Sequence, residues 1–172
     1  MENDHRWVIS DTHFWHKRII DYCARPFTSV ERMNEEIVRR WNCKIKTKDT
    51  VYHLGDFAMG DKDIISDMIS RLKGYKILML GNHDRKSVSW WERVGFDEVH
   101  KSPIVVEDYI LSHYPLPRDQ MLFSNGKINV HGHLHSQSIK TDGKHICVCM
   151  DYTDFFPVSF SSLPKLHKKQ AA

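Results

Sequence analysis

The sequence predicts a layered α/β protein with its sheets in the middle. Three observations support this fold class. In the first half, short apolar runs alternate with segments whose apolar residues recur at helical spacing. In the second half, strand-like segments follow one another closely. The chain has 172 residues with 41% hydrophobic content, which suits a single domain over 1–172 with one sizeable core.

Strand and helix patterns alternate from residue 6 to residue 94. Apolar runs that stop at polar or glycine-containing turns predict strands at 6–10, 50–56 and 75–80. Helical spacing of apolar residues predicts helices at 28–41, 63–72 and 87–94. Thr28 stands three residues before Glu31, the spacing of a capping box, so we expect the first helix to begin there. Between the first strand and this helix, "DTHFWHK" predicts a polar turn.

The second half predicts strands within 102–115, 127–135 and 145–150. Asp142 and Gly143 supply a turn signal between the last two. Only 37 residues follow residue 135 (172 minus 135), enough for closing strands and a tail helix but not for another domain.

Charge and composition narrow the class of protein. Lysine and arginine exceed the acidic residues by 25 to 22, and the only basic cluster is a small one near the C-terminus. This balance argues against a dedicated nucleic-acid surface but allows a nucleotide-sized substrate. No signal peptide pattern or membrane span is visible, so we expect a cytoplasmic protein. The sequence indicates no oligomeric state.

Four cysteines, at 23, 43, 147 and 149, form no C-x-x-C pair. Cys147 and Cys149 are two residues apart and so share one face of a predicted strand. We interpret the cysteines as buried free thiols, with a metal or redox site as the alternative.

Aspartate, asparagine and histidine recur where predicted strands end. They are Asp11, His13, Asp56, Asn82, His83, Asp84 and His113. In α/β sheets the carboxyl ends of the strands are where ligands bind, so these side chains should meet at one rim. Carboxylate, imidazole and amide groups together favour ions such as Mn²⁺, Fe²⁺ or Zn²⁺. With the histidines near residue 133 there are too many ligands for one ion, but the set suits two ions that share a carboxylate.

Spacing alone does not settle how "HGHLH" at 131–135 takes part. Its three histidines could act on one ion, divide between two, or include a bystander. His131 lies formally on the same strand face as His133, so the pattern does not exclude it as a ligand.

In order along the chain, "DTH" at 11–13, "GD" at 55–56, "GNHD" at 81–84, His113 and "GHLH" at 132–135 resemble the motifs of the calcineurin-like metallophosphoesterases. The resemblance spans residues 11–135 and is closest to small single-domain bacterial and phage members. It implies a four-layer αββα sandwich with two mixed β-sheets and a dinuclear metal site.

The resemblance also implies a role for each ligand. Asp11, His13 and His135 correspond to ligands of the first metal, whereas Asn82, His113 and His133 correspond to ligands of the second. Asp56 corresponds to the bridging carboxylate. His131 is then left over as a structural or supporting residue, with an extra ligand as the alternative.

By the same resemblance, His83 is the general acid that protonates the leaving oxygen while a metal-bridging hydroxide attacks. Asp84 would orient the imidazole of His83. The alternative is a loop histidine capped by an aspartate.

The segment after His13 offers two substrate-binding candidates, His16 and Arg25. The segment is similar to the "DTHFGHKN" opening of small family members, except that Trp15 replaces a glycine, which changes the expected mouth of the pocket. His16 could contact the substrate, support a ligand or simply lie on the surface. Arg25 is a candidate phosphate contact.

The resulting hypothesis is a phosphoric ester hydrolase with two divalent ions, most suitably Mn²⁺ in vitro, with Fe, Zn, Ni or Co as alternatives. We expect it to cleave phosphodiester bonds of a small nucleotide-like substrate. Phosphomonoester hydrolysis at the same site is the main alternative. A nuclease would need a basic groove or a capping domain, and a non-catalytic protein-binding scaffold would not need the intact set of ligands.

Overall fold

The structure is a computed structural model that describes residues 5–122, 124–135, 137 and 143–171. The helices are α1 (Arg18–Tyr22), α2 (Val30–Lys44), α3 (Lys62–Ser70), α4 (Val88–Val94), α5 (Arg118–Leu122) and α6 (Leu163–Ala171), with a 3₁₀ turn at Phe160–Ser162. The strands are β1 (Arg6–Ile9), β2 (Thr50–His53), β3 (Tyr75–Met79), β4 (Glu98–His100), β5 (Ile104–Val106), β6 (Tyr109–Ser112), β7 (Ile128–His131), β8 (His145–Cys147) and β9 (Val158–Ser159).

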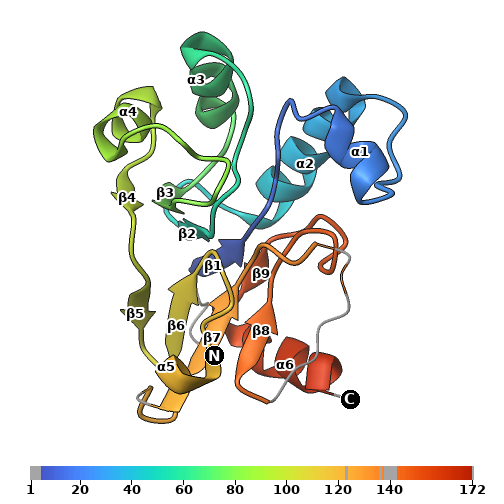
Figure 1. Cartoon of the computed structure of the whole chain (residues 1–172). Helices are drawn as coiled ribbons and strands as arrows, with labels where there is room; N and C mark the ends of the chain where they lie inside the picture. The colour runs from blue at the N-terminus through green and yellow to red at the C-terminus, as the bar shows by residue number, and fades with distance from the viewer. Residues whose placement is uncertain (1–4, 123, 136, 138–142, 172) are drawn as a thin grey trace.

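The strands form two sheets in the middle of the molecule (Figure 1). The first has the order β4-β3-β2-β1-β9, in which β1 to β4 are parallel and β9 is antiparallel. The second has the order β5-β6-β7-β8, in which only β5 is antiparallel to its neighbour. Both sheets are therefore mixed, which confirms the predicted α/β class.

Helices flank the two sheets (Figure 1). The apolar faces of α2, α3 and α4 and the first sheet share one core, which includes Ile37, Trp41 and Leu78. A second core fills the space between the sheets and includes Val8, Leu54 and Val130. At the edge of the second sheet, α6 packs beside β8. Two mixed sheets with helices around them are consistent with the expected αββα arrangement.

One contact explains how α6 protects the edge of the second sheet. The Gln170 side chain donates to the backbone carbonyl of Cys147 at 2.8 Å and accepts from its backbone N–H at 2.9 Å. An amide side chain thus takes the place of a further strand and satisfies the open edge of β8.

The helix expected at 28–41 spans Val30–Lys44, and its N-terminal cap lies one residue later than predicted. Its cap is Ser29, whose hydroxyl accepts from the Arg32 N–H at 3.3 Å, so Thr28 is not the cap. The segment predicted as a polar turn and loop also contains the short helix α1, whose buried Ile19 anchors it to the first core.

Three predicted strands are shorter than their apolar patterns. Strand β2 stops at His53, β7 at His131 and β8 at Cys147. The backbone then turns into left-handed conformations, for example at Asp56 (φ 56°) and His133 (φ 71°), which a β-strand cannot contain. Gly143 lies in a bend, whereas Asp142 lies outside the described residues.

The carboxyl ends of the central strands of both sheets meet at one edge. Ser10, just after β1, forms a parallel bridge with Cys149, just after β8. This bridge connects the two sheets and brings the loops after β1, β2 and β7 together. Among the described residues, no helix is both long enough and apolar enough to cross a membrane.

Candidate metal centre

The loops that follow the strands hold their polar residues in unusual backbone conformations. Five of the predicted ligands have positive φ angles between 46° and 71°, namely Asp11, His13, Asp56, His133 and His135. Such conformations cost of order 1–3 kcal/mol each and concentrate at functional sites. Hydrogen bonds between loops hold them, including Asp11 N–H to the Gly55 carbonyl and His13 N–H to the Asp56 carbonyl, both at 3.0 Å.

Two motif glycines are required by close approach. A Cβ on Gly132 would lie 2.0 Å from Ser10 Oγ and 2.4 Å from Asp11 Oδ2. A Cβ on Gly81 would lie 2.2 Å from Asp56 Oδ1. Both carboxylates are thus seated against the backbone of a neighbouring loop, which explains the glycine at the start of "GHLH" and of "GNHD".

The first ligand group comprises Asp11, His13, Asp56 and His135, whose potential ligand atoms all lie within 4.8 Å of one another. His13 Nε2 lies 3.3 Å from His135 Nε2 and 3.6 Å from Asp56 Oδ2. Asp11 Oδ1 lies 3.6 Å from His135 Nε2 and is buried without a hydrogen-bond partner. Two imidazole nitrogens that face each other beside an unsatisfied carboxylate oxygen fit a divalent cation.

The second ligand group comprises Asp56, His113 and His133. His113 Nε2 lies 3.6 Å from Asp56 Oδ2 and 2.9 Å from Asn82 Oδ1, so the asparagine joins this group. Asp56 therefore belongs to both groups. The structure brings all the sequence-predicted ligands together.

Burial raises the free energy of the charged carboxylates in this site unless a cation is bound nearby. Asp56 is 2% exposed, and burial raises the pKa of its carboxyl, with a further contribution from the nearby Asp11 carboxylate. His13 is equally buried, and burial together with the neighbouring His135 holds its pKa well below the ordinary value. A divalent ion binds ionised carboxylates and neutral imidazoles, so it would suit the neutral His13 and would offset the cost of burying the Asp56 charge.

Asp151 is a further residue of the candidate site, one that the sequence motifs do not single out. Its Oδ2 accepts from His135 Nδ1 at 3.0 Å, which directs Nε2 of that ring toward the first ligand group. Burial opposes a charge on His135, but its hydrogen bonds with Asp151 and Cys23 outweigh burial and raise its pKa to about 10. Asp151 directly follows the strand pattern "HICVCM", so the strand-end rule that found Asp11 and Asp56 would also have identified it.

Arg25 does not occupy the predicted position. Its side chain is fully buried and donates to both Asp151 oxygens, at 2.9 and 3.1 Å. It also donates to the backbone carbonyls of Asp11 and Thr12, at 2.8 and 3.0 Å. The prediction of a phosphate contact is therefore wrong, because the guanidinium is buried and hydrogen-bonds to the loops that carry the candidate ligands.

The cysteines divide into two kinds. Cys147 and Cys149 are buried free thiols, whereas Cys23 is half-buried and Cys43 is exposed, contrary to the expectation for all four. Cys149 Sγ donates to Asp11 Oδ2 at 3.0 Å and accepts from the His135 N–H at 3.3 Å. Burial raises the pKa of Cys149, which keeps it a protonated donor beside the carboxylate.

His83 faces the ligand groups without being a member of either. Its Nε2 lies 4.0 Å from Asp56 Oδ2, and its ring has no hydrogen-bond partner among the described residues. Its backbone N–H donates to Asp56 Oδ1 at 2.8 Å. The side chain is 34% exposed, so its ring nitrogen is available to a substrate.

Asp84 does not orient His83 as expected. Its carboxylate accepts instead from the backbone N–H groups of Asp56, Gly81 and Phe57, at 2.7, 2.9 and 3.0 Å. Burial raises its pKa to about 6, and the Asp56 charge adds to this shift. Asp84 therefore ties the loops after β2 and β3 together and acts on the site through Asp56.

A cavity of about 310 Å³ opens beside the first ligand group. It is lined by His13, His83 and His135, by Ile19 and Tyr22 of α1, and by His16, Cys23 and Gln137. His16 Nδ1 lies 3.2 Å from His13 Nδ1, and burial together with the neighbouring His83 lowers the pKa of His16. His16 is thus placed at the cavity, in reach of a substrate.

His131 lies apart from both ligand groups. It is 1% exposed, and its Nδ1 lies 2.8 Å from the Gly132 carbonyl oxygen. Burial lowers its pKa to about 4. Because β7 ends at this residue and the chain then turns, strand spacing does not place it on the same side as His133.

The sequence is similar to a known domain family and to several known proteins. Residues 6–149 match the calcineurin-like phosphoesterase superfamily domain. An uncharacterized protein of Methanocaldococcus jannaschii is 33% identical, with 95% of this chain and 91% of that protein covered. The gene 66 protein of Mycobacterium phage L5 is 31% identical, with coverages of 77% and 78%.

Two solved structures share the fold. A protein of unknown function from Aquifex aeolicus superposes with a TM-score of 0.72 at 27% identity, covering 94% of this chain and 98% of that one. The nuclease MPE of Pseudomonas putida superposes with a TM-score of 0.52 at 20% identity, covering 77% and 62%. At that identity the second likeness concerns the fold alone.

Proposed function

The chain belongs to the calcineurin-like phosphoesterase superfamily, and from this membership we propose that it is a phosphodiesterase that uses two divalent ions. The observation that carries the proposal is the position of Asp56. Its Oδ2 lies 3.6 Å from a histidine of each ligand group, His13 and His113. A single carboxylate that faces both groups suits a ligand shared by two ions.

The residues around Asp56 fit the two ions. Asp11, His13 and His135 would hold the first, Asn82, His113 and His133 would hold the second, and Asp56 would contact both. Bound there, the ions would supply Lewis-acid activation of the phosphoryl group and of the attacking water. Manganese is the ion we expect to support turnover best in vitro, because the donor set mixes imidazole with oxygen ligands.

His83 would deliver the proton that the leaving oxygen needs. It lines the cavity, it is not committed to another described residue, and it is fixed by its backbone N–H to Asp56 Oδ1. A positioned donor of this kind contributes about 10²- to 10⁴-fold to a rate. Arg25 and Asp151 would contribute indirectly, because they hold the His135 ring in place.

Two features of the surroundings favour a diester over a monoester. No lysine or arginine is found among the described residues that line the cavity, so a dianionic phosphate would have no cationic side chain beyond the ions. Exposed aromatic rings flank the centre on two sides. Tyr22 lines the cavity, and the Tyr114 ring centroid is 4.5 Å from that of His133. Two such rings could each contact one organic arm of a small nucleotide-like diester.

The test compares bis-p-nitrophenyl phosphate with p-nitrophenyl phosphate at matched Mn²⁺ and pH. We expect the larger kcat/KM for the diester. The Asp56→Asn variant serves as the control for contaminating phosphatases, and it should lose both activities. A kcat/KM about tenfold or more in favour of the monoester would overturn the substrate class, and absence of any metal-dependent turnover would favour a scaffold.

The size of the preferred substrate needs a separate assay. Dinucleotides, cyclic nucleotides and a labelled oligonucleotide should be compared at equal concentrations of ester bonds. Preference for the small esters supports the proposal, whereas preference for the oligonucleotide would indicate a nuclease.

A further inference from the structure

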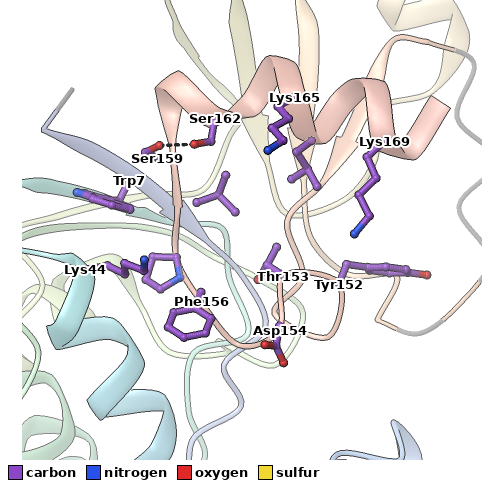
Figure 2. A pocket seen from close by; sticks show the side chains of 13 residues that line it. Trp7, Lys44, Tyr152, Thr153, Asp154, Phe156, Ser159, Ser162, Lys165 and Lys169 are labelled. Atoms are coloured by element: carbon purple, nitrogen blue, oxygen red, sulfur yellow. Dashed lines mark hydrogen bonds between the residues drawn. The ribbon is translucent and has the colours of Figure 1, made fainter. Parts of the chain in front are cut away.

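A second cavity of about 710 Å³ lies beside the 152–157 turn (Figure 2), and it shares no lining residue with the cavity beside the first ligand group. Side chains from β1, α2, the turn and α6 line it. We call it the lysine–aromatic cavity, after Lys44, Lys165, Lys169, Trp7, Tyr152 and Phe156. Its described lining contains no histidine, and its only acidic residue is Asp154, so it is suited to binding and not to metal-dependent hydrolysis.

The cavity carries uncompensated positive charge. Lys165 and Lys169 leave one face of α6 at i,i+4 spacing and extend toward the turn (Figure 2). Neither these two lysines nor Lys44 forms an ion pair with any described residue. Asp154 is already paired with Arg40, at 3.2 Å. Three lysines beside one carboxylate, which is itself paired with Arg40, favour an anion with more than one charge.

The aromatic rings are held in place by contacts that need no ligand. Trp7 Nε1 donates to Asp49 Oδ2 at 3.0 Å, and the Tyr152 hydroxyl donates to the Gln137 carbonyl. Lys44 Nζ lies 5.5 Å from the centroid of the Phe156 ring. Rings fixed beforehand lose little entropy on binding, which makes them good surfaces for a planar aromatic group.

We propose that the lysine–aromatic cavity binds a nucleotide, with the base against the aromatic rings and the phosphates near Lys165 and Lys169. The combination of aromatic rings with lysines supports this class, because neither a simple anion nor an uncharged aromatic molecule would use both. The volume lies within the range of about 300–1,000 Å³ that is usual for small-molecule sites. The nucleotide could be free or could be part of a single strand.

The test titrates the metal-loaded full chain with the α,β-methylene analogue of ADP, whose phosphate bridge cannot be hydrolysed. We expect the double variant Lys165→Ala, Lys169→Ala to bind about tenfold more weakly, because two exposed charge contacts are lost. Lys168→Ala is the matched control, since Lys168 is exposed on the same helix but does not line the cavity, and its affinity should stay unchanged. Turnover of bis-p-nitrophenyl phosphate should be the same in all these variants.

Two results would overturn the proposal. One is equal affinity in the wild type and the double variant. The other is that methylenediphosphonate binds as tightly as the nucleotide analogue in the titration step that the double variant weakens, because the base would then contribute nothing. A step that is unchanged in the double variant reports binding at the metal centre instead. Binding and turnover are separate readouts, so failure here leaves the phosphodiesterase proposal untouched.

A further titration with a short single-stranded oligonucleotide distinguishes a free nucleotide from a nucleotide within a single strand. Tighter binding of the strand than of the free nucleotide, weakened by the double variant, assigns the cavity to a strand. Weaker binding of the strand assigns it to a free nucleotide. Both outcomes presuppose that the nucleotide analogue binds.

Discussion

The two ligand groups share Asp56 but differ in how they are supported. In the first, the His135 ring is held by Asp151, and Asp11 accepts from Cys149 and from the His133 N–H. In the second, His113 Nδ1 faces the Leu54 carbonyl oxygen at 2.8 Å. His133 is half-buried and lies against the exposed ring of Tyr114.

This difference concerns preorganisation. The first group is braced by buried side chains that would have to move before its ligands could separate, whereas the second is supported mainly by backbone and lies nearer to solvent. Since ligands held in place pay less ordering entropy on binding, we expect the first position to hold its ion more tightly. The predictions below test this contrast, beginning with the largest effect on turnover.

Asp56→Asn should abolish the difference in metal affinity between the two positions, because both lose their shared ligand. Each ion supplies several kcal/mol to the transition state, so we expect turnover to fall by roughly 10⁴-fold or more. Elemental analysis at saturating Mn²⁺ should show loss of metal from both positions. Retention of one full equivalent would mean that Asp56 belongs to a single position.

His83→Ala should leave the difference in metal affinity between the two positions intact while removing the proposed proton donor. We expect about 10²- to 10⁴-fold slower diester cleavage with unchanged metal content. The comparison of substrates with good and poor leaving groups is informative, because the loss should be larger for the poor one. Near-normal turnover would exclude His83 as the acid.

Asp151→Asn should weaken the first position alone. Residues that orient a ligand usually contribute 10- to 100-fold to metal affinity, so one of two binding steps in a Mn²⁺ titration should weaken by about that factor. Asp49→Asn is the control, because Asp49 is an equally buried carboxylate at the opposite end of the strands. Equal weakening of both steps would show that the two positions are not independently supported.

His131→Asn should change neither position and should instead alter acid stability. Burial lowers the pKa of His131 to about 4, against about 6.5 when unfolded, so the unfolded chain takes up a proton first as the pH falls. The contribution of the neutral His131 to the free energy of unfolding is complete above pH 6.5 and is lost as the pH falls toward 4. Urea unfolding of the wild type should lose about 2 kcal/mol more than the variant between pH 7 and 4.5. Loss of metal in the variant would contradict its position outside both groups.

Much of the fold could be predicted, as could the meeting of the candidate ligands at one place, because both depend on local patterns. Apolar runs marked the strands, and helical spacing marked α2, α3 and α4. The predicted ligands follow strand ends, where parallel topology forces side chains from distant segments to meet. The predicted strands continue too far beyond His53 and His131. The left-handed loop residues that follow continue the same alternation of polar and apolar residues, so the pattern does not mark the end of the strand.

The supporting residues were harder to predict because their roles depend on tertiary contacts. Arg25 precedes a proline in an apparent loop, and only the fold shows that it is buried against Asp151. Asp84 follows His83 directly, yet its carboxylate points to backbone N–H groups of another loop. Neighbourhood in sequence suggested a partnership that the geometry does not support.

The order of the ligands along the chain has a consequence for biosynthesis. Asp11 and His13 leave the ribosome early, but the first group also needs His135, and the second needs His113 and His133. Neither group can be complete until the chain has been made as far as residue 133. The nascent chain therefore presents no finished centre to cellular metals, and ion loading must follow the meeting of both sheets.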